Sequence, residues 1–87
     1  MRKGEQTLSR SILGKTVVSK SGKTFGMVGD LVFESRTGEI IYIVLKGETP
    51  FAKTFEFERN PGGQALIPFN AVMATGDFVV VAEEDIV

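Results

Sequence analysis

Asp30 is the acidic residue whose surroundings in the sequence most invite a chemical role. It follows Gly29 inside the apolar run from Phe25 to Phe33, where a carboxylate could serve as a general base or a cation ligand. No second acid or base stands beside it. A carboxylate next to a glycine within a strand can instead accept hydrogen bonds from backbone N–H groups at a β-bulge. We favour this structural interpretation of Asp30.

Two tripeptides imitate the end of a phosphate-binding loop: Gly14-Lys15-Thr16 and Gly22-Lys23-Thr24. That loop also requires a glycine five residues before its Gly-Lys pair, and a helix after it. This chain has Ser9 and Val17 at the required positions, and strand-like sequence follows each tripeptide. Neither tripeptide therefore predicts a nucleotide site.

Composition excludes several further kinds of chemistry. The chain has no Cys and no His, which removes thiolate nucleophiles, imidazole bases and nearly all zinc geometries. Lys and Arg number 10 against 11 Asp and Glu, so no broad positive field exists to gather phosphates. We expect no enzymatic activity, no catalytic residue, no metal and no cofactor, and we do not expect nucleic acid to be the principal partner.

Three phenylalanines, Phe51, Phe55 and Phe57, lie within seven residues of a connecting segment. Polar turn residues would suffice there, so these aromatic side chains need an explanation. One interpretation is a cap over the core of a small β domain. The other is a docking site for a partner protein, because aromatic residues contribute strongly to interface energies. The sequence leaves both interpretations open.

The elements that must position these residues are short strands. Apolar runs on both sides of a polar segment containing Gly38 predict an antiparallel hairpin over residues 25–46, and a bulge at Gly29 and Asp30 would bring Val28, Leu31 and Phe33 onto one face. Pro61-Gly62 suits the centre of a type II turn in a second hairpin. Gly26 and Gly76 are further expected turn or bulge positions. The other predicted strands cover residues 16–19, 54–59, 64–69 and 78–82, with a helical turn before Gly14 and another before Gly76.

Two of these strands are apolar on both faces, so one barrel interior cannot bury all their side chains. The surplus face needs a lid, the chain's own terminus or a second subunit. We expect a two-fold homodimer as the commonest form of closure. The residues expected in its interface are Ile40, Tyr42, Val44, Val79 and Val81.

Length and patterning predict one small domain over residues 8–87, with residues 1–7 flexible. The longest apolar run, Ile40 to Leu45, is far shorter than the roughly 20 residues that span a bilayer. We therefore expect a cytoplasmic protein that does not insert into a membrane itself. The terminal Ile86-Val87 could add to the sheet edge of a neighbouring molecule.

The order of turn and core residues resembles the PRC-barrel family, the small β-barrels named for the photosynthetic reaction centre H subunit and also found in the ribosome-maturation factor RimM. The resemblance covers Leu8 to Ala82. It predicts an all-β fold, a small antiparallel barrel of about six strands with one or two short helical turns. The residues that carry it are Leu13-Gly14-Lys15 before Val17, then Gly22, Gly26, Val28, Asp30 and Leu31, then Thr37-Gly38 before Ile41, then Ile67-Pro68, and finally Val72 and Gly76 before Phe78 to Val81.

The resemblance implies a non-catalytic adaptor that binds other proteins. Short stand-alone members are familiar from archaea, where some are linked to the cell-division apparatus of FtsZ and its membrane anchor SepF. Such a partner would recruit this chain to the membrane. The alternative that the family implies is a ribosome-assembly or RNA-associated module like that of RimM, although the N-terminal domain of RimM is missing here. A small-ligand or enzymatic barrel is the third alternative.

Overall fold

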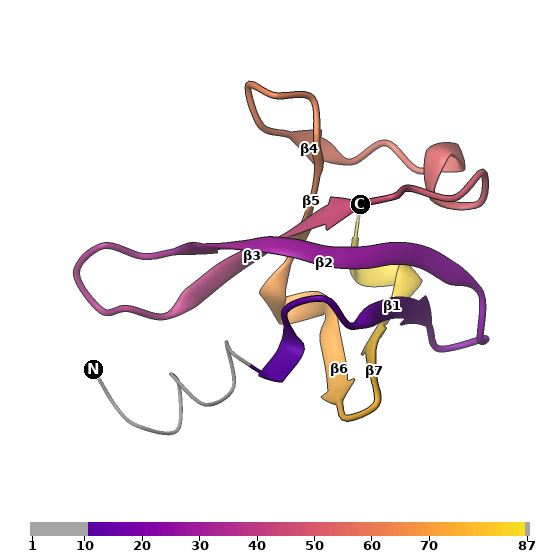
Figure 1. The fold of residues 1–87 in the computed structure, drawn as a ribbon, viewed down its shortest axis with the longest axis horizontal. Coiled ribbons are helices and arrows are strands. Elements are labelled where there is room, and N and C mark those ends of the chain that lie inside the picture. The colour runs from indigo at the N-terminus through magenta and orange to yellow at the C-terminus, as the bar shows by residue number, and fades with distance from the viewer. Residues whose placement is uncertain (1–10, 87) are drawn as a thin grey trace.

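In the computed structural model, which describes residues 11–86, seven strands form one mixed sheet in the order β4-β5-β3-β2-β1-β7-β6 (Figure 1). The all-β fold class is confirmed, with one strand more than predicted. The strands are β1 (Thr16–Ser19), β2 (Thr24–Phe33), β3 (Ile40–Lys46), β4 (Glu58–Arg59), β5 (Ala65–Pro68), β6 (Val72–Thr75) and β7 (Phe78–Val81), and three short 3-10 helices join them, η1 (Ala52–Thr54), η2 (Phe69–Ala71) and η3 (Glu83–Asp85).

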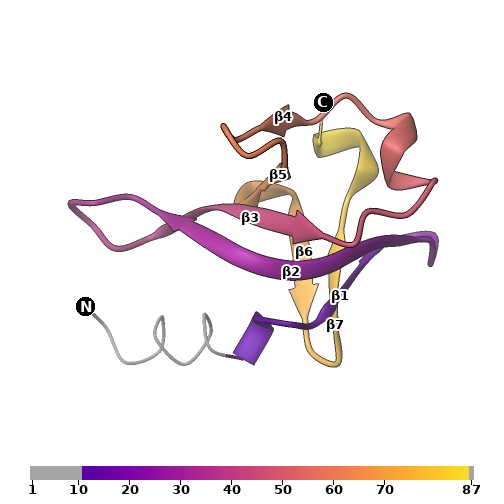
Figure 2. The same cartoon turned by 45° about the horizontal axis from the view of Figure 1, so that its top comes forward.

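The β2–β3 hairpin is the longest element, and its tip projects beyond the rest of the barrel (Figures 1 and 2). At the turn, Gly38 has a φ of 75°, and its N–H donates to the carbonyl of Glu34 at 2.8 Å. The pairing shifts register between Val28 and Asp30, which confirms the predicted bulge. The Leu31 N–H donates to Oδ1 of Asp30 at 2.8 Å, the structural role expected for this carboxylate.

The bulge brings only part of the predicted apolar set to the interior. Val28 and Leu31 are buried, but Phe33 is 42% exposed. A second register shift, between Val32 and Phe33, interrupts the alternation. Phe33 is also the last residue of β2, where the strand leads into the hairpin turn.

The second hairpin forms, but it is short and its turn is not type II. Only Glu58 and Arg59 pair with β5. The Gly63 N–H donates to the carbonyl of Asn60 at 2.8 Å, and the positive φ, 83°, falls on Gly63. A type II turn would place it on Gly62. Pro61 and Gly62 thus occupy the centre of the turn with backbone angles of another type.

Strand pairing around β1 differs most from the prediction. β1 pairs with β2 antiparallel and with β7 parallel, so the sheet is mixed. The segment expected to hold a helical turn before Gly76 contains η2 and then a strand, β6, that pairs with β7. Ser11 and Ile12 are helical and Gly14 follows with a φ of 82°, as expected, while Leu8, Ser9 and the predicted flexible residues 1–7 lie outside the described residues.

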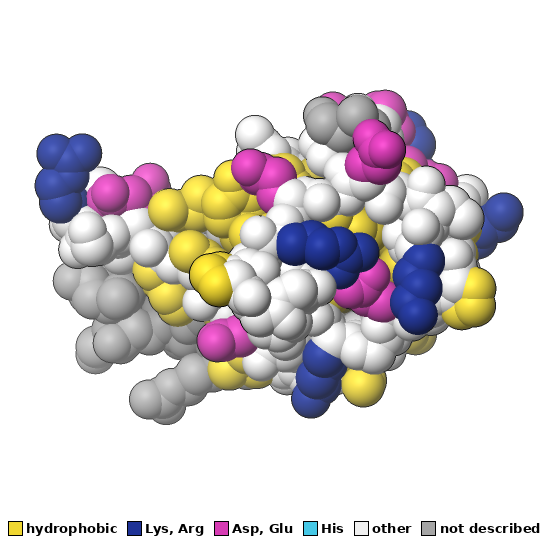
Figure 3. Space-filling view, turned by 90° about the horizontal axis from the view of Figure 1, so that it is seen from above, with side chains coloured by type: hydrophobic (Ala, Val, Ile, Leu, Met, Phe, Trp, Pro, Cys, Tyr) yellow, Lys and Arg dark blue, Asp and Glu magenta, His cyan; other side chains and the backbone are white. Residues whose placement is uncertain are grey.

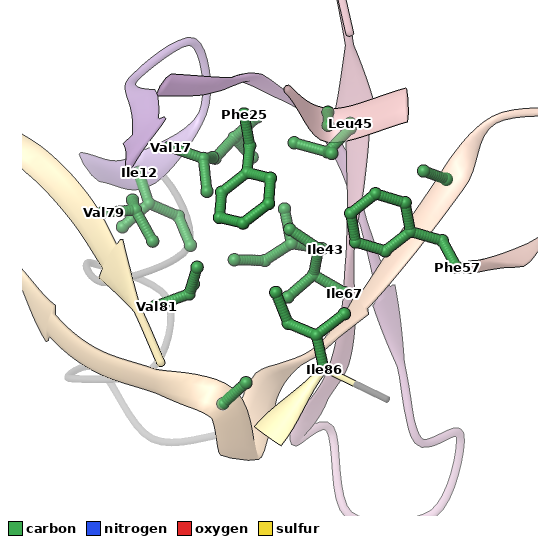
Figure 4. Close-up of a cluster of buried hydrophobic side chains, with 14 of the residues drawn as sticks. Ile12, Val17, Phe25, Ile43, Leu45, Phe57, Ile67, Val79, Val81 and Ile86 are labelled. Carbon is green, nitrogen blue, oxygen red and sulfur yellow. The ribbon is translucent and has the colours of Figure 1, made fainter. Parts of the chain in front are cut away.

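Side chains from β1, β2, β3, β5 and β7 meet in one hydrophobic core (Figure 4). Phe25, Ile43 and Ile67 are fully buried near its centre, and Ile12 closes one end. Ile86, which we expected at a neighbouring molecule's sheet edge, instead packs into this same core and is 7% exposed. The core contains Ile12, Val17, Phe25, Val28, Leu31, Ile43, Leu45, Ala52, Phe57, Ala65, Ile67, Ala71, Val79, Val81 and Ile86.

Candidate protein-interaction surfaces

The predicted docking phenylalanines form an aromatic cluster over Phe25. The ring centroids of Phe51 and Phe55 lie 5.0 and 5.1 Å from that of fully buried Phe25, and Phe57 lies 6.0 Å away. Most of these pairs are tilted or edge-to-face, the geometries that aromatic quadrupoles favour. Phe57 is buried, while Phe51 and Phe55 are half-buried. This placement favours the cap interpretation.

Hydrogen bonds of Thr49 hold the segment carrying this cluster against β2. Its hydroxyl donates to the carbonyl of Thr24 at 2.6 Å and accepts from the Ala52 N–H at 3.2 Å. Its own N–H donates to the carbonyl of Phe25 at 3.0 Å. The turn into η1 is therefore fixed to the barrel. Lys23 adds a cation–π contact, with its Nζ 5.3 Å from the Phe51 ring centroid.

Three of the five residues expected in a dimer interface are buried within one chain. Val79 and Val81 belong to the hydrophobic core, and Val44 is only 4% exposed. They are therefore not available to a second copy, and this part of the expectation is corrected. Ile40 and Tyr42 are half-buried. The alternate side chains of β7, those of Phe78 and Val80, face outward instead.

The outward side chains of β7, β1 and β2 form a surface that we call the outer face: Thr16, Val18, Met27, Phe78 and Val80. Register places Thr16 between Phe78 and Met27, and Val18 beside Val80. Phe78 is 52% exposed and Met27 41% exposed. No charged side chain belongs to this set. The outer face is therefore a largely apolar surface on the sheet, and exposed Lys46, which pairs with Met27, borders it on β3.

A second apolar surface is a groove of about 570 Å³ where β3 begins and η2 follows β5. Pro68 is the last residue of β5 and lies opposite Tyr42, so within residues 11–86 no strand pairs with Ile40 and Ile41 on that side. Pro has no N–H to extend the ladder, which suits the end of a strand. Figure 3 shows hydrophobic side chains gathered along the hairpin, inward of the charged side chains at its tip. The residues lining the groove are Glu34, Glu39, Ile40, Ile41, Tyr42, Pro68, Phe69 and Asn70.

Acidic groups surround this groove. Glu34 accepts hydrogen bonds from the N–H groups of Arg36 and Thr37 at 2.8 and 3.1 Å and so supports the hairpin turn. The Tyr42 hydroxyl donates to Glu58 at 2.7 Å, and this hydrogen bond, with the carboxylate charge, raises the pKa of Tyr42. Glu39 is exposed, and its carboxylate has no ion-pair or hydrogen-bond partner among the described residues.

Two further ion pairs lie away from the groove. The Arg59 guanidinium contacts both carboxylate oxygens of Glu48, at 2.8 and 3.1 Å, and lowers the pKa of that carboxyl. Lys20 pairs with Glu84 at 2.6 Å. Across residues 11–86 no three acidic side chains lie close enough together to hold a metal ion. No helix in that range has the length and apolar character needed to cross a membrane.

The barrel topology agrees with comparisons of the sequence with known proteins. Residues 5–85 match the family model described as "PRC-barrel domain". The chain belongs to the PRC-barrel family. This PRC barrel is also similar to the "Uncharacterized protein MJ1118" of Methanocaldococcus jannaschii, with 26% identity over 82 residues that cover 94% of this chain and 88% of the relative.

Sequence reasoning named some residues of these surfaces and missed others. Ile40 and Tyr42 were predicted to lie in a homodimer interface, and both line the groove. Ile41 and Phe69 were missed, because the groove depends on where β5 stops and which way η2 turns. Pro68 was the available signal, as a residue that ends strand pairing. Phe78 was missed because the side chains on both faces of β7 are apolar, so the sequence does not show which face is exposed.

Proposed function

We propose that this PRC barrel is a non-catalytic adaptor that self-associates and holds partner proteins together. The single observation that supports this proposal is the outer face, where Phe78 and Met27 flank Thr16 on neighbouring strands and remain exposed. Exposed apolar surface of this kind marks interaction sites in many proteins. The five residues of the outer face carry no charge, and exposed Lys46 borders them beside Met27.

A two-fold dimer is the simplest assembly that covers the outer face. The same patch then serves both subunits, and Phe78 of each copy contacts the sheet of the other. Sedimentation equilibrium at tens of micromolar should give a species of twice 9.5 kDa. Phe78→Asp should shift the equilibrium to monomer, because a carboxylate in an apolar interface loses hydration without gaining a partner.

Phe33→Asp is the matched control for the dimer. Phe33 is 42% exposed, similar to Met27, but lies on the hairpin away from the outer face. This variant should remain dimeric. A wild-type protein that sediments as a 9.5 kDa monomer would refute self-association, and monomer formation by Phe33→Asp alone would move the interface to the hairpin.

As the partner we propose a cell-division anchor of the SepF type. This choice rests on the family and on the archaeal source of its relative. Calorimetric titration of a purified archaeal SepF into the protein should give saturable heat that changes little between low and high salt. Binding of ribosomal RNA that weakens steeply with salt, together with no binding of SepF, would favour the ribosome-assembly alternative instead.

A further inference from the structure

We propose that the groove between the start of β3 and η2 binds an extended segment of a partner protein in which Lys or Arg residues flank apolar ones. This inference deepens the proposed adaptor function and rests on it, because it names the chemistry of one partner segment. It concerns a surface separate from the outer face.

The shape of the groove favours an extended chain over a small molecule. Its volume of about 570 Å³ is large enough for a ligand, but Ile41 is 39% exposed and Glu39 is exposed, so the walls do not enclose it. Small-molecule sites generally bury most of their ligand's surface. An extended segment needs only to place alternate side chains into the groove while the others stay in solvent.

The end of β5 supplies a place for such a segment. Register pairs Tyr42 with Pro68, and the preceding residues of β3 have no strand partner on that side within residues 11–86. A bound segment could lie along Ile40 and Ile41, with its apolar side chains against Ile41 and Phe69. Asn70 is exposed beside them, and its amide can both donate to and accept from a bound backbone.

Charge selects the partner segment. Among residues 11–86, the charged side chains that line the groove are those of Glu34 and Glu39, and none of the lining residues in that range is Lys or Arg. Glu34 is partly engaged by the hairpin turn and has Arg36 3.9 Å away, but Glu39 has no partner among the described residues. A Lys or Arg on the bound segment would pair with Glu39, whereas an acidic segment would meet repulsion.

The experiment uses the full chain and a phage-displayed library of random short peptides. Peptides selected on the wild-type protein should combine Lys or Arg with Ile, Leu or Val. Ile41→Asp should weaken their binding about tenfold or more, as should Glu39→Lys, and higher salt should weaken it further. A selection repeated on Glu39→Lys should recover acidic peptides.

Val32→Asp is the matched control. Val32 lies on the same hairpin with a similar exposure of 36%, pairs with Tyr42, and does not line the groove. It should leave peptide affinity unchanged. Thermal melts of all three variants establish that each is folded at the assay temperature, and Ile41→Thr replaces Ile41→Asp if the latter is not.

Several results would overturn the inference. They are a selection without charge preference, affinity insensitive to both Ile41→Asp and Glu39→Lys, and peptide binding that only Phe78→Asp weakens. If the wild-type protein selects no peptides but a variant without residues 1–6 does, this chain's own N-terminus is the occupant. This outcome can be separated from a failure of the adaptor function. If the Ile41→Asp dimer binds its partner as well as the wild-type protein does, the groove alone is refuted. If the wild-type protein neither dimerises nor binds a partner, the adaptor function is refuted.

Discussion

Gly26 lies so close to the backbone of Lys46 that a Cβ on Gly26 would stand 2.7 Å from the Lys46 carbonyl oxygen. Its φ of 156° is also rare for residues with a side chain. The contact joins β2 to the end of β3. A side chain there would have to move backbone rather than another side chain.

Gly26→Ala should therefore lower the free energy of unfolding by about 2 kcal/mol or more, through backbone strain and overpacking. Urea unfolding measures this loss. Gly29→Ala should cost less, because its nearest neighbours are Lys46 side-chain atoms that can move. Gly76→Ala is the neutral control, since a Cβ at Gly76 would have no neighbouring atom within 4 Å. Equal losses for the three variants would contradict the close-approach argument.

Phe55→Ala distinguishes an aromatic cap from a docking site. Phe55 contacts Phe25, Phe51 and Phe57 with ring centroids 5.1 to 5.7 Å apart. Its removal should cost about 3 kcal/mol of folding stability, as truncation of a packed aromatic residue does. Phe33→Ala, at an exposed position, should change stability by about 0.5 kcal/mol or less. An unchanged melting temperature with weakened partner binding would instead support docking through Phe55.

Asp30 should act on stability alone. Its carboxylate accepts the Leu31 N–H at the bulge, so Asp30→Ala should lower the unfolding free energy by about 1 kcal/mol. Asp30→Asn should cost less, because the amide oxygen can still accept that bond. Denaturant unfolding tests both variants. A reproducible catalytic turnover lost in Asp30→Asn, with the fold intact, would show that the structural role is not the whole account.

The Glu48–Arg59 pair should contribute to stability in a pH-dependent way. Arg59 lowers the pKa of Glu48 in the folded state below its ordinary value of 4.5. The unfolded chain then binds the proton more readily, so the contribution is complete above pH 4.5 and is lost as pH falls through the lower folded pKa. Glu48→Gln should be less stable than wild type at pH 7, and the difference should shrink below pH 4.5. A difference that is constant from pH 7 to pH 3 would contradict this linkage.

Local patterns predicted the first half of this fold well. β1 has the predicted bounds, and β2 and β3 differ by a residue or two at their ends, because turn glycines and runs of β-branched residues mark them clearly. The bulge at Asp30 was also visible as a change of phase along β2. These features depend on neighbours in the sequence.

The rest depended on contacts distant in the sequence. β6 was missed because Val72-Met73-Ala74-Thr75 shows no alternation and contains residues common in helices. The sequence could not predict which alternate side chains of β7 face the core, because Val79 and Val80 are equally apolar. Pairing with β1 is what turns Val79 inward. The groove likewise depends on a long-range pairing, because it exists where β5 ends opposite Tyr42, and Pro68 was its signal in the sequence.

The parallel pairing of β1 with β7 has a consequence for synthesis of the chain. β1 is the first of the seven strands to be synthesised, and its partner β7 is the last of the seven. Until then, Val17 and the other inward side chains of β1 lack one of their two neighbouring strands. Contacts of such long sequence separation also slow folding. We expect the barrel to close only after β7 has left the ribosome, so nascent chains stalled before Phe78 should remain sensitive to protease, while chains in which β7 has emerged should become resistant.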